Sequence, residues 1–352
     1  MEITELLEKA VQMNASDIHI SVGIPPVIRK EGKLVRLEEY GNITPKISFE
    51  LIFSMLSDLH KKKIEEELDI DFSYGISGVG RFRVNVFRQR GVWGAVLRLI
   101  PWEIPSLESL ELPPVIAEFA KLVRGLVLVT GPTGSGKSTT LASLVNIINK
   151  TRECHIITIE DPIEYLHSHK KSIVDQREVG NDTKSFARAV RASLREDPDV
   201  ILVGEMRDLE TISAAITAAE TGHLVFSTLH TNDAPQTVDR IIDVFPTNQQ
   251  QQIRTQLSTA LQGVVSQALL PKIGGGRIVA VEVMIATPAV RNLIRDGKTS
   301  QLYSVIQTSG RYGMQQLDSS LKDLVLRGKV SFEDAFTVAV NKEEFMRLVG
   351  RL

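Results

Sequence analysis

A glycine-rich segment, GPTGSGKS at residues 131–138, has the residue types and the spacing of a phosphate-binding loop. It matches G-x-x-x-x-G-K-[ST] and lies between an apolar run and a stretch of helical periodicity, as this motif requires. Glycines allow successive backbone N–H groups to turn toward a phosphate, and the following helix adds the positive end of its dipole. The alternative, a glycine-rich turn without a ligand, is disfavoured by the flanking strand and helix.

This loop is therefore predicted to bind a nucleoside triphosphate together with Mg²⁺. Lys137 is predicted to reach the outer phosphates, and the Ser138 hydroxyl is predicted to be a ligand of the metal ion. The predicted nucleotide-binding residues are Gly131, Pro132, Thr133, Gly134, Ser135, Gly136, Lys137, Ser138 and Thr139.

A candidate catalytic acid follows in DPDVILVGEMRD, residues 197–208, where an apolar strand delivers Glu205 at its carboxyl end. In most P-loop enzymes an Asp that helps to hold magnesium comes just before such an acid. Here that residue is Gly204. An acid close to a γ-phosphate can orient and polarise the attacking water. Glu205 is therefore predicted to be the catalytic base, and the alternative is a structural ion pair with Arg207.

Three further acids, Glu160, Asp161 and Glu164, follow the apolar run of HIITIEDPIEYL, residues 155–166. Ligands of open α/β sheets bind at the carboxyl ends of the parallel strands. Magnesium commonly keeps several waters, so a carboxylate can serve it through water. The three acids are therefore predicted to serve the metal ion, with the choice between Glu160 and Asp161 left open. The alternative is that they cap a loop.

Two histidines, His223 and His230, bracket a further apolar strand in TGHLVFSTLHTND, residues 221–233. A seven-residue spacing is not a usual pattern of metal ligands, and no Cys or third His is close in sequence, so zinc is disfavoured. Because both histidines frame a strand of the nucleotide-binding sheet, they are predicted to sense the γ-phosphate. The alternative for each is a packing role.

Arginines gather in two places. Arg188, Arg191 and Arg195 form a basic stripe on a helix predicted for 184–196, separate from its apolar stripe. In the N-terminal half, the alternation of the sequence places Arg83 on the same strand face as Arg81. Arg98 interrupts an apolar run, and a guanidinium buried there would need an anionic partner. The set indicates contact with an anion, which a ring oligomer would bring from the next subunit. The alternative is surface arginines matched by neighbouring acids.

The elements that must position these residues fall into four parts. Residues 1–100 are predicted to fold as a first domain, with helices at 3–13 and 48–67, extended segments at 18–22 and 27–37, and antiparallel strands at 69–76, 80–88 and 91–100. The proline-rich segment 101–114 is predicted to be the interdomain linker.

The second half alternates strands and helices, which is typical of a mostly parallel sheet covered on both faces. Its predicted strands are 126–130, 155–159, 199–203 and 224–228, within an ATPase core of residues 115–285. Residues 286–352 are predicted to be helical, at 288–296, 300–308, 314–327 and 331–340.

Composition limits the classes of function. The chain has 352 residues and a formal net charge of −2, which argues against a protein that coats nucleic acid. A single cysteine, Cys154, excludes a disulfide framework and a Cys-based zinc site. The N-terminus lacks the features of a signal peptide, and no apolar run has the length of a membrane span, so a soluble, cytoplasmic protein is expected.

Together the motifs resemble the type II/IV secretion ATPases, hexameric motors of the RecA-like P-loop class, over nearly the whole chain. The resemblance rests on the P-loop at 131–138, the acidic segment at 160–164, the Gly-Glu ending of the Walker-B-like strand at 204–205 and the histidine segment at 223–230. Within this family the chain resembles the branch that retracts type IV pili. It is short, lacks paired CxxC motifs and carries PAVRNLIRDG at 288–297.

The resemblance implies an α/β fold with a RecA-like P-loop ATPase domain, a smaller α+β PAS-like N-terminal domain and a helical C-terminal region. It implies a homo-hexamer that hydrolyses ATP with Mg²⁺ at subunit contacts and drives twitching motility. There Arg83 and Arg98 would act from the first domain of a neighbour, with Arg191 and Arg195 closing the site.

The implied partner is an inner-membrane pilus platform protein, without nucleic acid. The implied location is the cytoplasmic face of the inner membrane, reached only through the pilus machinery. A pilus assembly or type II secretion ATPase is the alternative within the family.

The segment AVRNLIRDG at 289–297 is predicted to form an amphipathic helix that ends at Gly297. Its apolar stripe comprises Val290, Leu293 and Ile294. The opposite side chains are predicted to be available for a partner, and they are Arg291, Asn292 and Arg295. The alternative, docking of the helix onto its own domain, explains the apolar stripe alone.

Overall fold

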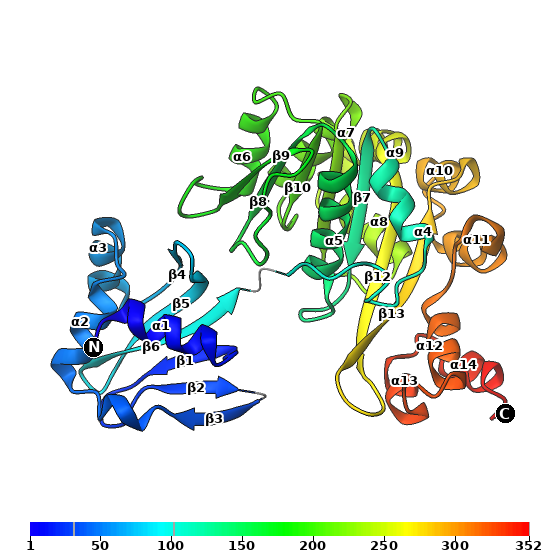
Figure 1. Ribbon diagram of the computed structural model, residues 1–352. Coiled ribbons are helices and arrows are strands. Elements are labelled where there is room, and N and C mark those ends of the chain that lie inside the picture. The colour runs from blue at the N-terminus through cyan, green and yellow to red at the C-terminus, as the bar shows by residue number, and fades with distance from the viewer. Residues whose placement is uncertain (31, 101–102, 352) are drawn as a thin grey trace. The chain divides into compact units, whose positions relative to one another are not determined.

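A computed structural model describes residues 1–30, 32–100 and 103–351 of the protein. It divides into two compact units (Figure 1). The first comprises Met1–Glu103 with Pro162–Leu166, and the second comprises Ile104–Asp161 with His167–Leu352. Pro101 and Trp102, which begin the predicted linker, lie outside the described residues.

The first unit is built on a six-stranded antiparallel sheet in the order β3-β2-β1-β6-β5-β4. Its strands are β1 (Asp17–Ile20), β2 (Val27–Lys30), β3 (Lys33–Arg36), β4 (Asp69–Ile76), β5 (Gly80–Gln89) and β6 (Val92–Ile100). Its helices are α1 (Ile3–Gln12), α2 (Pro45–Phe53) and α3 (Asp58–Glu67). The three long strands predicted for this unit are thereby confirmed.

The single helix predicted for 48–67 is wrong, because two helices occupy this part of the chain. Thr44 accepts a hydrogen bond from the Ile47 backbone N–H at the start of α2, and Ser57 accepts one from the His60 N–H at the start of α3. A serine that caps a helix N-terminus in this way begins a new helix and interrupts the preceding one.

One face of this sheet carries the core, and the other carries polar side chains. In β5 the alternate residues Phe82, Val84 and Val86 are fully buried against the hydrophobic side chains of the three helices. Arg81 and Arg83 lie on the opposite face, as the period-2 alternation of the sequence predicts.

The second unit is built on a seven-stranded mixed sheet in the order β13-β12-β7-β11-β10-β8-β9. Its strands are β7 (Gly125–Thr130), β8 (His155–Glu160), β9 (Ile173–Glu178), β10 (Val200–Val203), β11 (Leu224–Leu229), β12 (Leu261–Pro271) and β13 (Arg277–Ile285). All neighbours pair in parallel except β13, which is antiparallel to β12. The four predicted strands are confirmed, whereas β9, β12 and β13 were not predicted.

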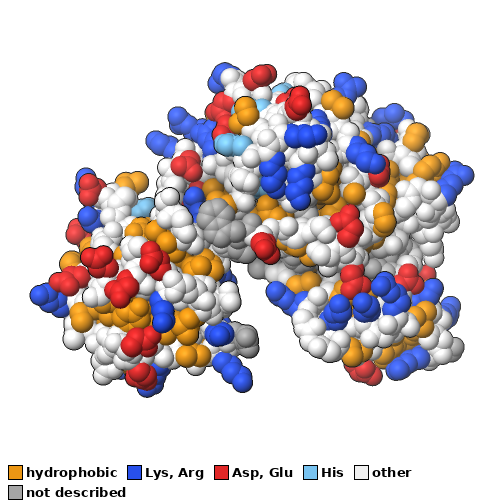
Figure 2. All heavy atoms as spheres, viewed as in Figure 1, with side chains coloured by type: hydrophobic (Ala, Val, Ile, Leu, Met, Phe, Trp, Pro, Cys, Tyr) orange, Lys and Arg blue, Asp and Glu red, His pale blue; other side chains and the backbone are white. Residues whose placement is uncertain are grey.

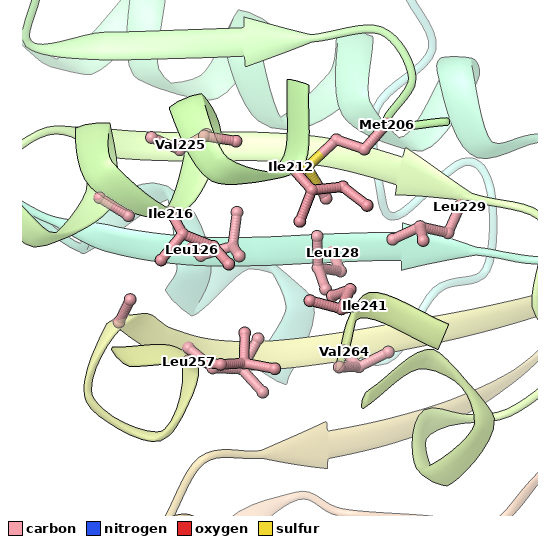
Figure 3. Close-up of a cluster of buried hydrophobic side chains, with 14 of the residues drawn as sticks. Leu126, Leu128, Met206, Ile212, Ile216, Val225, Leu229, Ile241, Leu257 and Val264 are labelled. Atoms are coloured by element: carbon pink, nitrogen blue, oxygen red, sulfur yellow. The ribbon is translucent and has the colours of Figure 1, made fainter. Parts of the chain in front are cut away.

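Helices cover both faces of this sheet, as the hydrophobic strands require. In β7, Val127 and Val129 face the cluster that includes helix α5 (Lys137–Thr151), and Leu126 and Leu128 face the opposite cluster. Figure 3 shows that opposite cluster, where side chains of the strands meet those of three helices. These helices are α7 (Leu209–Glu220), α8 (Ala234–Asp243) and α9 (Thr247–Ala260).

The C-terminal residues are helical, as predicted. The helices are α10 (Pro288–Arg295), α11 (Leu302–Thr308), α12 (Leu317–Leu326), α13 (Phe332–Val338) and α14 (Lys342–Leu348). The last three pack with Leu270 and Ile278 of the β12–β13 hairpin into a small core of their own. Helix α14 was not predicted.

Most of the predicted linker belongs to the second unit. Leu107 and Leu112 are buried in the same core as helix α4 (Val115–Glu118). Glu111 forms ion pairs with Lys272 and Lys329, each at 3.1 Å. The segment after Glu103 is therefore anchored to the second unit by both apolar and ionic contacts.

Charged side chains of both signs are distributed over the surface (Figure 2). The face in Figure 2 shows basic and acidic side chains over each unit, in keeping with a net charge of −2. Among residues 1–30, 32–100 and 103–351, no helix combines the length and the apolar character of a membrane-spanning segment.

Candidate nucleotide site

The P-loop connects the carboxyl end of β7 to the N-terminus of α5. Three of its glycines, Gly131, Gly134 and Gly136, have φ values of +139°, +81° and +89°, a region that favours glycine. The Lys137 ammonium donates hydrogen bonds to the carbonyls of Gly131 (2.8 Å) and Pro132 (3.0 Å). The loop therefore curls back over its own lysine at the positive end of the α5 dipole, an arrangement suited to phosphate.

Strand β12, which the sequence interpretation missed, forms the wall behind this loop. A Cβ added at Gly131 would lie 2.3 Å from the backbone carbonyl oxygen of Gln267 and 2.6 Å from Ser135 Oγ. The Gln267 carboxamide also donates a hydrogen bond to Thr140 Oγ1 in α5, at 2.9 Å. Gln267 thus contacts both the start of the loop and the helix that follows it.

We expect Gly131→Ala to destabilise the protein by about 2 kcal/mol or more and to abolish nucleotide binding. The added Cβ combines a disfavoured φ with a clash against backbone, which cannot rotate away. Thermal unfolding and binding of a fluorescent nucleotide check this. The comparison is Gly134→Ala, which also has a positive φ, at +81° nearer the left-handed region, but nothing within 4 Å of the added Cβ. Equal stability of the two variants would contradict the close contact with Gln267.

Glu205 lies beyond the carboxyl end of β10, two strands from β7 and thus about 10 Å from the start of the P-loop. Its Oε1 accepts a hydrogen bond from Arg207 Nε at 2.6 Å and lies 2.8 Å from His230 Nε2. Burial would raise the pKa of Glu205, but Arg207 and His230 together hold it below its ordinary value. The side chain is therefore ionised at neutral pH.

The ion pair with Arg207 that sequence reasoning left as the alternative is thus present. It occupies one carboxylate oxygen, and neither contact uses Oε2. The Glu205 side chain is 17% exposed. An ionised, partly accessible carboxylate can still accept a hydrogen bond from a water molecule, so the ion pair does not exclude a catalytic role.

Close packing favours glycine at position 204, where most P-loop enzymes have an Asp. A Cβ at this position would lie 3.1 Å from the Ile159 carbonyl oxygen and 3.3 Å from the Glu160 Cα. Its N–H donates to the Ile159 carbonyl at 2.7 Å. A side chain at 204 would therefore be crowded by the end of β8, whose backbone would have to shift by a few tenths of an ångström to admit it.

The predicted metal-binding acids are divided between the units. Glu160 ends β8 at the same end of the sheet as Glu205, and its Oε1 accepts hydrogen bonds from Thr158 (2.6 Å) and Gln176 (3.1 Å). Asp161 follows directly, whereas Glu164 falls in the segment 162–166 of the first unit. Among the described residues, no group of three Asp, Glu, His or Cys side chains is arranged to hold a metal ion.

The two histidines lie at opposite ends of β11, so they cannot both contact one phosphate within a single chain, and γ-phosphate sensing stays a prediction for each. His230 follows the carboxyl end and contacts Glu205. His223 precedes Leu224, which pairs with Gly125 at the start of β7, and its Nδ1 lies 2.9 Å from the Ala218 carbonyl oxygen. The six residues of β11 lie between them, and because an extended chain rises by about 3.3 Å per residue, the two histidines are about 20 Å apart.

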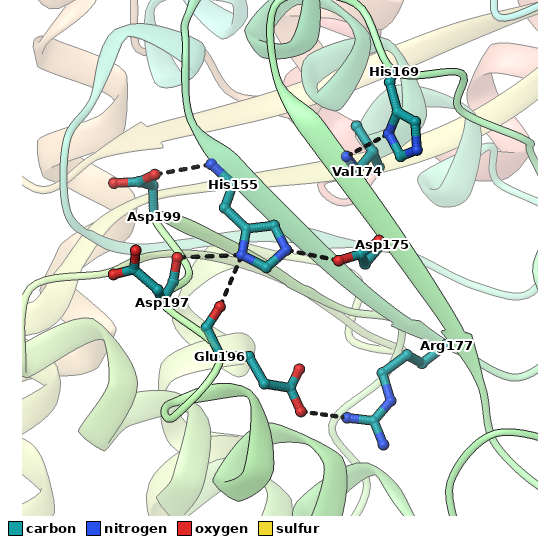
Figure 4. Close-up of polar contacts among 8 residues, drawn as sticks. All are labelled: His155, His169, Val174, Asp175, Arg177, Glu196, Asp197 and Asp199. Carbon is teal, nitrogen blue, oxygen red and sulfur yellow. Dashed lines mark hydrogen bonds and ion pairs between the residues drawn. The ribbon is translucent and has the colours of Figure 1, made fainter.

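The basic stripe lies on helix α6 (Phe186–Ser193), which is shorter than the predicted 184–196 and leaves Arg195 beyond its end. Arg191 pairs with Glu210 at 3.3 Å. Arg195 precedes Glu196 and Asp197, whose carbonyl oxygens contact His155 Nδ1 at the start of β8 (Figure 4). Arg195 is therefore at the amino end of the sheet, opposite the P-loop of its own chain.

Arg83 and Arg98 belong to the first unit, where they are direct cross-strand partners in β5 and β6. Although Arg98 interrupts an apolar run of the sequence, its side chain is 71% exposed. Its anionic partner is Asp17 of β1, with Arg98 Nε donating to Oδ1 at 2.8 Å. Arg83 lies 3.9 Å from Asp71, beyond hydrogen-bond distance.

Helix α10 corrects the prediction for its polar face. Arg291 is not available to a partner, because its guanidinium donates to the carbonyls of Ser258 (2.7 Å) and Thr259 (2.6 Å) at the end of α9. Burial lowers its pKa. Arg295 is half exposed and donates to Asn292 Oδ1 at 2.8 Å. Arg291 therefore attaches α10 to α9, in line with the docking alternative.

Comparisons with known proteins agree with this architecture. The family model described as "Type II/IV secretion system protein" matches residues 1–337. The type IV pilus retraction ATPase PilT of Pseudomonas aeruginosa is 53% identical over 98% of this chain and 100% of its own length. A twitching motility protein of Neisseria gonorrhoeae is 50% identical, over 90% of this chain and 85% of that protein.

A solved structure agrees as well. The crystal structure of the pilus retraction motor PilT with bound ADP has a TM-score of 0.92, with 53% identity and 99% of both chains covered. A family model that spans nearly the whole chain, and relatives of this similarity, show the family directly. The chain belongs to the type II/IV secretion system protein family.

Proposed function

We propose that this protein is an ATPase that retracts type IV pili and so drives twitching motility. The observation that carries the proposal is that the P-loop, Glu205 and His230 lie at the same end of one sheet in one chain. A phosphate cradle and an ionised acid about 10 Å apart leave room for a γ-phosphate and an attacking water. The similarity to pilus retraction ATPases over whole chains supports the direction of the motor.

Each residue of the site has a proposed role. Lys137 leaves the carbonyls of Gly131 and Pro132 and binds the outer phosphates, which are stronger acceptors. Glu205 orients and polarises the water through the oxygen that its ion pairs do not occupy. His230 reports the presence of the γ-phosphate to Glu205, since the two side chains are in contact. His223, at the other end of β11, could act only on another subunit.

The chemistry of the donors fits a magnesium ion held mainly by phosphate and water. Ser138 supplies a hydroxyl in the first turn of α5, and Glu160 or Asp161 would bind the water shell from the end of β8. When bound, the ion would neutralise charge on the transferring phosphoryl group. Glu164 has weaker support, because it belongs to the other unit.

The proposed assembly is a homo-hexamer in which subunits share sites. Arg195 lies at the end of the sheet opposite its own P-loop, and Arg83 and Arg98 are in the other unit. The position of Arg195 favours action on a neighbouring subunit, and we propose the same for Arg83 and Arg98, with Arg191 released from Glu210 to join them. In this proposal the second unit is a RecA-like motor domain, the first is a PAS-like domain, and nucleotide state moves one relative to the other.

The proposed partner is an inner-membrane pilus platform protein, contacted from the cytoplasmic side. The alternative is a motor of the same family that assembles pili or secretes proteins. A strain without the gene distinguishes them: loss of retraction should leave cells piliated but unable to twitch, whereas loss of an assembly motor should leave cells without pili. The wild-type gene should restore twitching, and the Lys137→Ala gene should not. A deletion strain that has no pili, and regains them with the wild-type gene, would contradict a retraction motor.

A further inference from the structure

A row of charged side chains crosses the face of the first sheet that is turned away from its helices. Asp17 in β1 is the direct cross-strand partner of Arg29 in β2 and of Arg98 in β6, and Arg98 is in turn the partner of Arg83 in β5. Residues paired in this way have their side chains next to one another on one face. Asp17 therefore stands between two arginines, with a third at the end of the row.

Asp17 is the buried member of this row. Its side chain is 8% exposed, compared with 71% for Arg98. Oδ1 accepts from Arg98 Nε at 2.8 Å, Oδ2 accepts from Ser16 Oγ at 2.8 Å, and Arg29 Nε is 3.8 Å from Oδ2. Burial would raise the pKa of Asp17, but these hydrogen bonds outweigh it and lower the pKa, so the carboxylate is ionised at neutral pH.

The geometry of the contact with Arg98 is selective. Asp17 uses only the Nε–H, at the root of the guanidinium. Within the part of the chain that the structure describes, Nη1 and Nη2 of Arg98 have no hydrogen-bond partner. These two nitrogens form the fork that binds an oxyanion with two parallel hydrogen bonds. Asp17 thus fixes the stem of the side chain and leaves the fork exposed.

We propose that Asp17 is a positioning residue, which holds Arg98 so that its fork meets the γ-phosphate bound by a neighbouring subunit. This inference rests on the proposed function, in which Arg98 acts between subunits. A long arginine side chain loses rotamer freedom when it binds a ligand. An arginine already held at Nε loses less, and it is aligned with the phosphoryl group before the reaction begins.

Two other roles of Asp17 make different predictions. If Asp17 were only a counter-charge, its removal would strengthen the attraction of Arg98 for phosphate and raise the rate. If it only stabilised the sheet, its removal would lower thermal stability, oligomer mass and ADP binding together. A positioning role lowers the rate while ADP binding stays the same.

The test uses full-length protein with Asp17→Asn, Arg98→Ala and the double substitution. Asp17→Asn is expected to lower kcat about tenfold with KM for ATP changed less than about twofold. Binding of ADP with aluminium fluoride, which mimics the transferring phosphoryl group, should weaken about tenfold, with binding of ADP alone unchanged. In the Arg98→Ala background, Asp17→Asn should have no further effect.

Two more variants and two structural measurements complete the design. Asp17→Glu keeps the charge and should recover part of the lost rate. Asp71→Asn removes the exposed acid that lies 3.9 Å from Arg83, and it should leave kcat within about twofold. Thermal unfolding and mass by light scattering are measured for every variant.

The outcomes separate this inference from the proposed function. If Arg98→Ala is slow and Asp17→Asn is as fast as wild type, the positioning role is overturned and the shared site stands. The positioning role is also overturned if Asp17→Asn lowers kcat equally in the wild-type and Arg98→Ala backgrounds. It is likewise overturned if Asp17→Asn lowers thermal stability, oligomer mass and ADP binding together. If Arg98→Ala is as fast as wild type, the proposed role of Arg98 fails, and the inference fails with it.

Discussion

Glu205→Gln is expected to lower ATP turnover by about 10²- to 10⁴-fold and to leave nucleotide binding intact. The amide keeps the size of the side chain, but it cannot accept a proton and polarises water less than a carboxylate does. Lys137 and the P-loop glycines, which would hold the phosphates, are not touched by the substitution. Phosphate release measures turnover, and equilibrium binding of a fluorescent ATP analogue measures affinity.

The control for this experiment is Arg207→Ala. The Arg207 side chain is 77% exposed and donates to Glu205 Oε1, so Glu205→Gln removes both a carboxylate and an ion pair. Arg207→Ala removes the ion pair alone. Since Arg207 holds the pKa of Glu205 low, its loss should raise that pKa and keep turnover within about tenfold of wild type. Near-normal hydrolysis by Glu205→Gln would contradict its role as the base.

A second large effect is expected from mixing two inactive variants. Lys137→Ala should lose nucleotide binding at its own P-loop, and Arg98→Ala should lose about 10³-fold or more in turnover, as when an arginine finger is removed. If each site combines the P-loop of one subunit with Arg98 of the next, mixed rings contain some interfaces with both residues intact. Random mixing in equal amounts should then restore roughly a quarter of wild-type activity.

The control for the mixing experiment is a mixture of Lys137→Ala with Glu205→Gln. Both residues are in the second unit and at the same end of one sheet, so they would serve the same site of one chain. Every interface in such a mixture lacks one of the two, and no activity should return. If Arg98→Ala with Lys137→Ala also stays inactive although mixed oligomers form, Arg98 does not act on a neighbour.

The elements whose signal is local could be predicted from the sequence. Apolar runs such as Leu126–Thr130 and the P-loop that follows one of them depend on residues close together in the chain, and they lie where expected. The Gly-Glu ending at 204–205 was identified correctly as the position of an acid beyond a buried strand. The crowding at Gly204 could be seen only in the structure, because the backbone atoms that an added Cβ would approach at 3.1 and 3.3 Å belong to β8.

The features that sequence reasoning missed depend on contacts between distant segments. Arg291 looks exposed on the periodicity of its own helix, yet the carbonyls that bind it are about 30 residues earlier, at the end of α9. Asp17 was overlooked for the same reason, since its partner Arg98 is 81 residues away. The glycine run at 274–276 was a hairpin signal that could have revealed β12 and β13.

The most direct test of the account measures phosphate release from ATP and Mg²⁺ by size-fractionated wild-type protein, with light scattering across the same fractions. The account predicts that hydrolysis coincides with a mass of about six chains and is absent from fractions of single chains. Hydrolysis that follows the single-chain fractions, or intact ATP in every fraction, would contradict it.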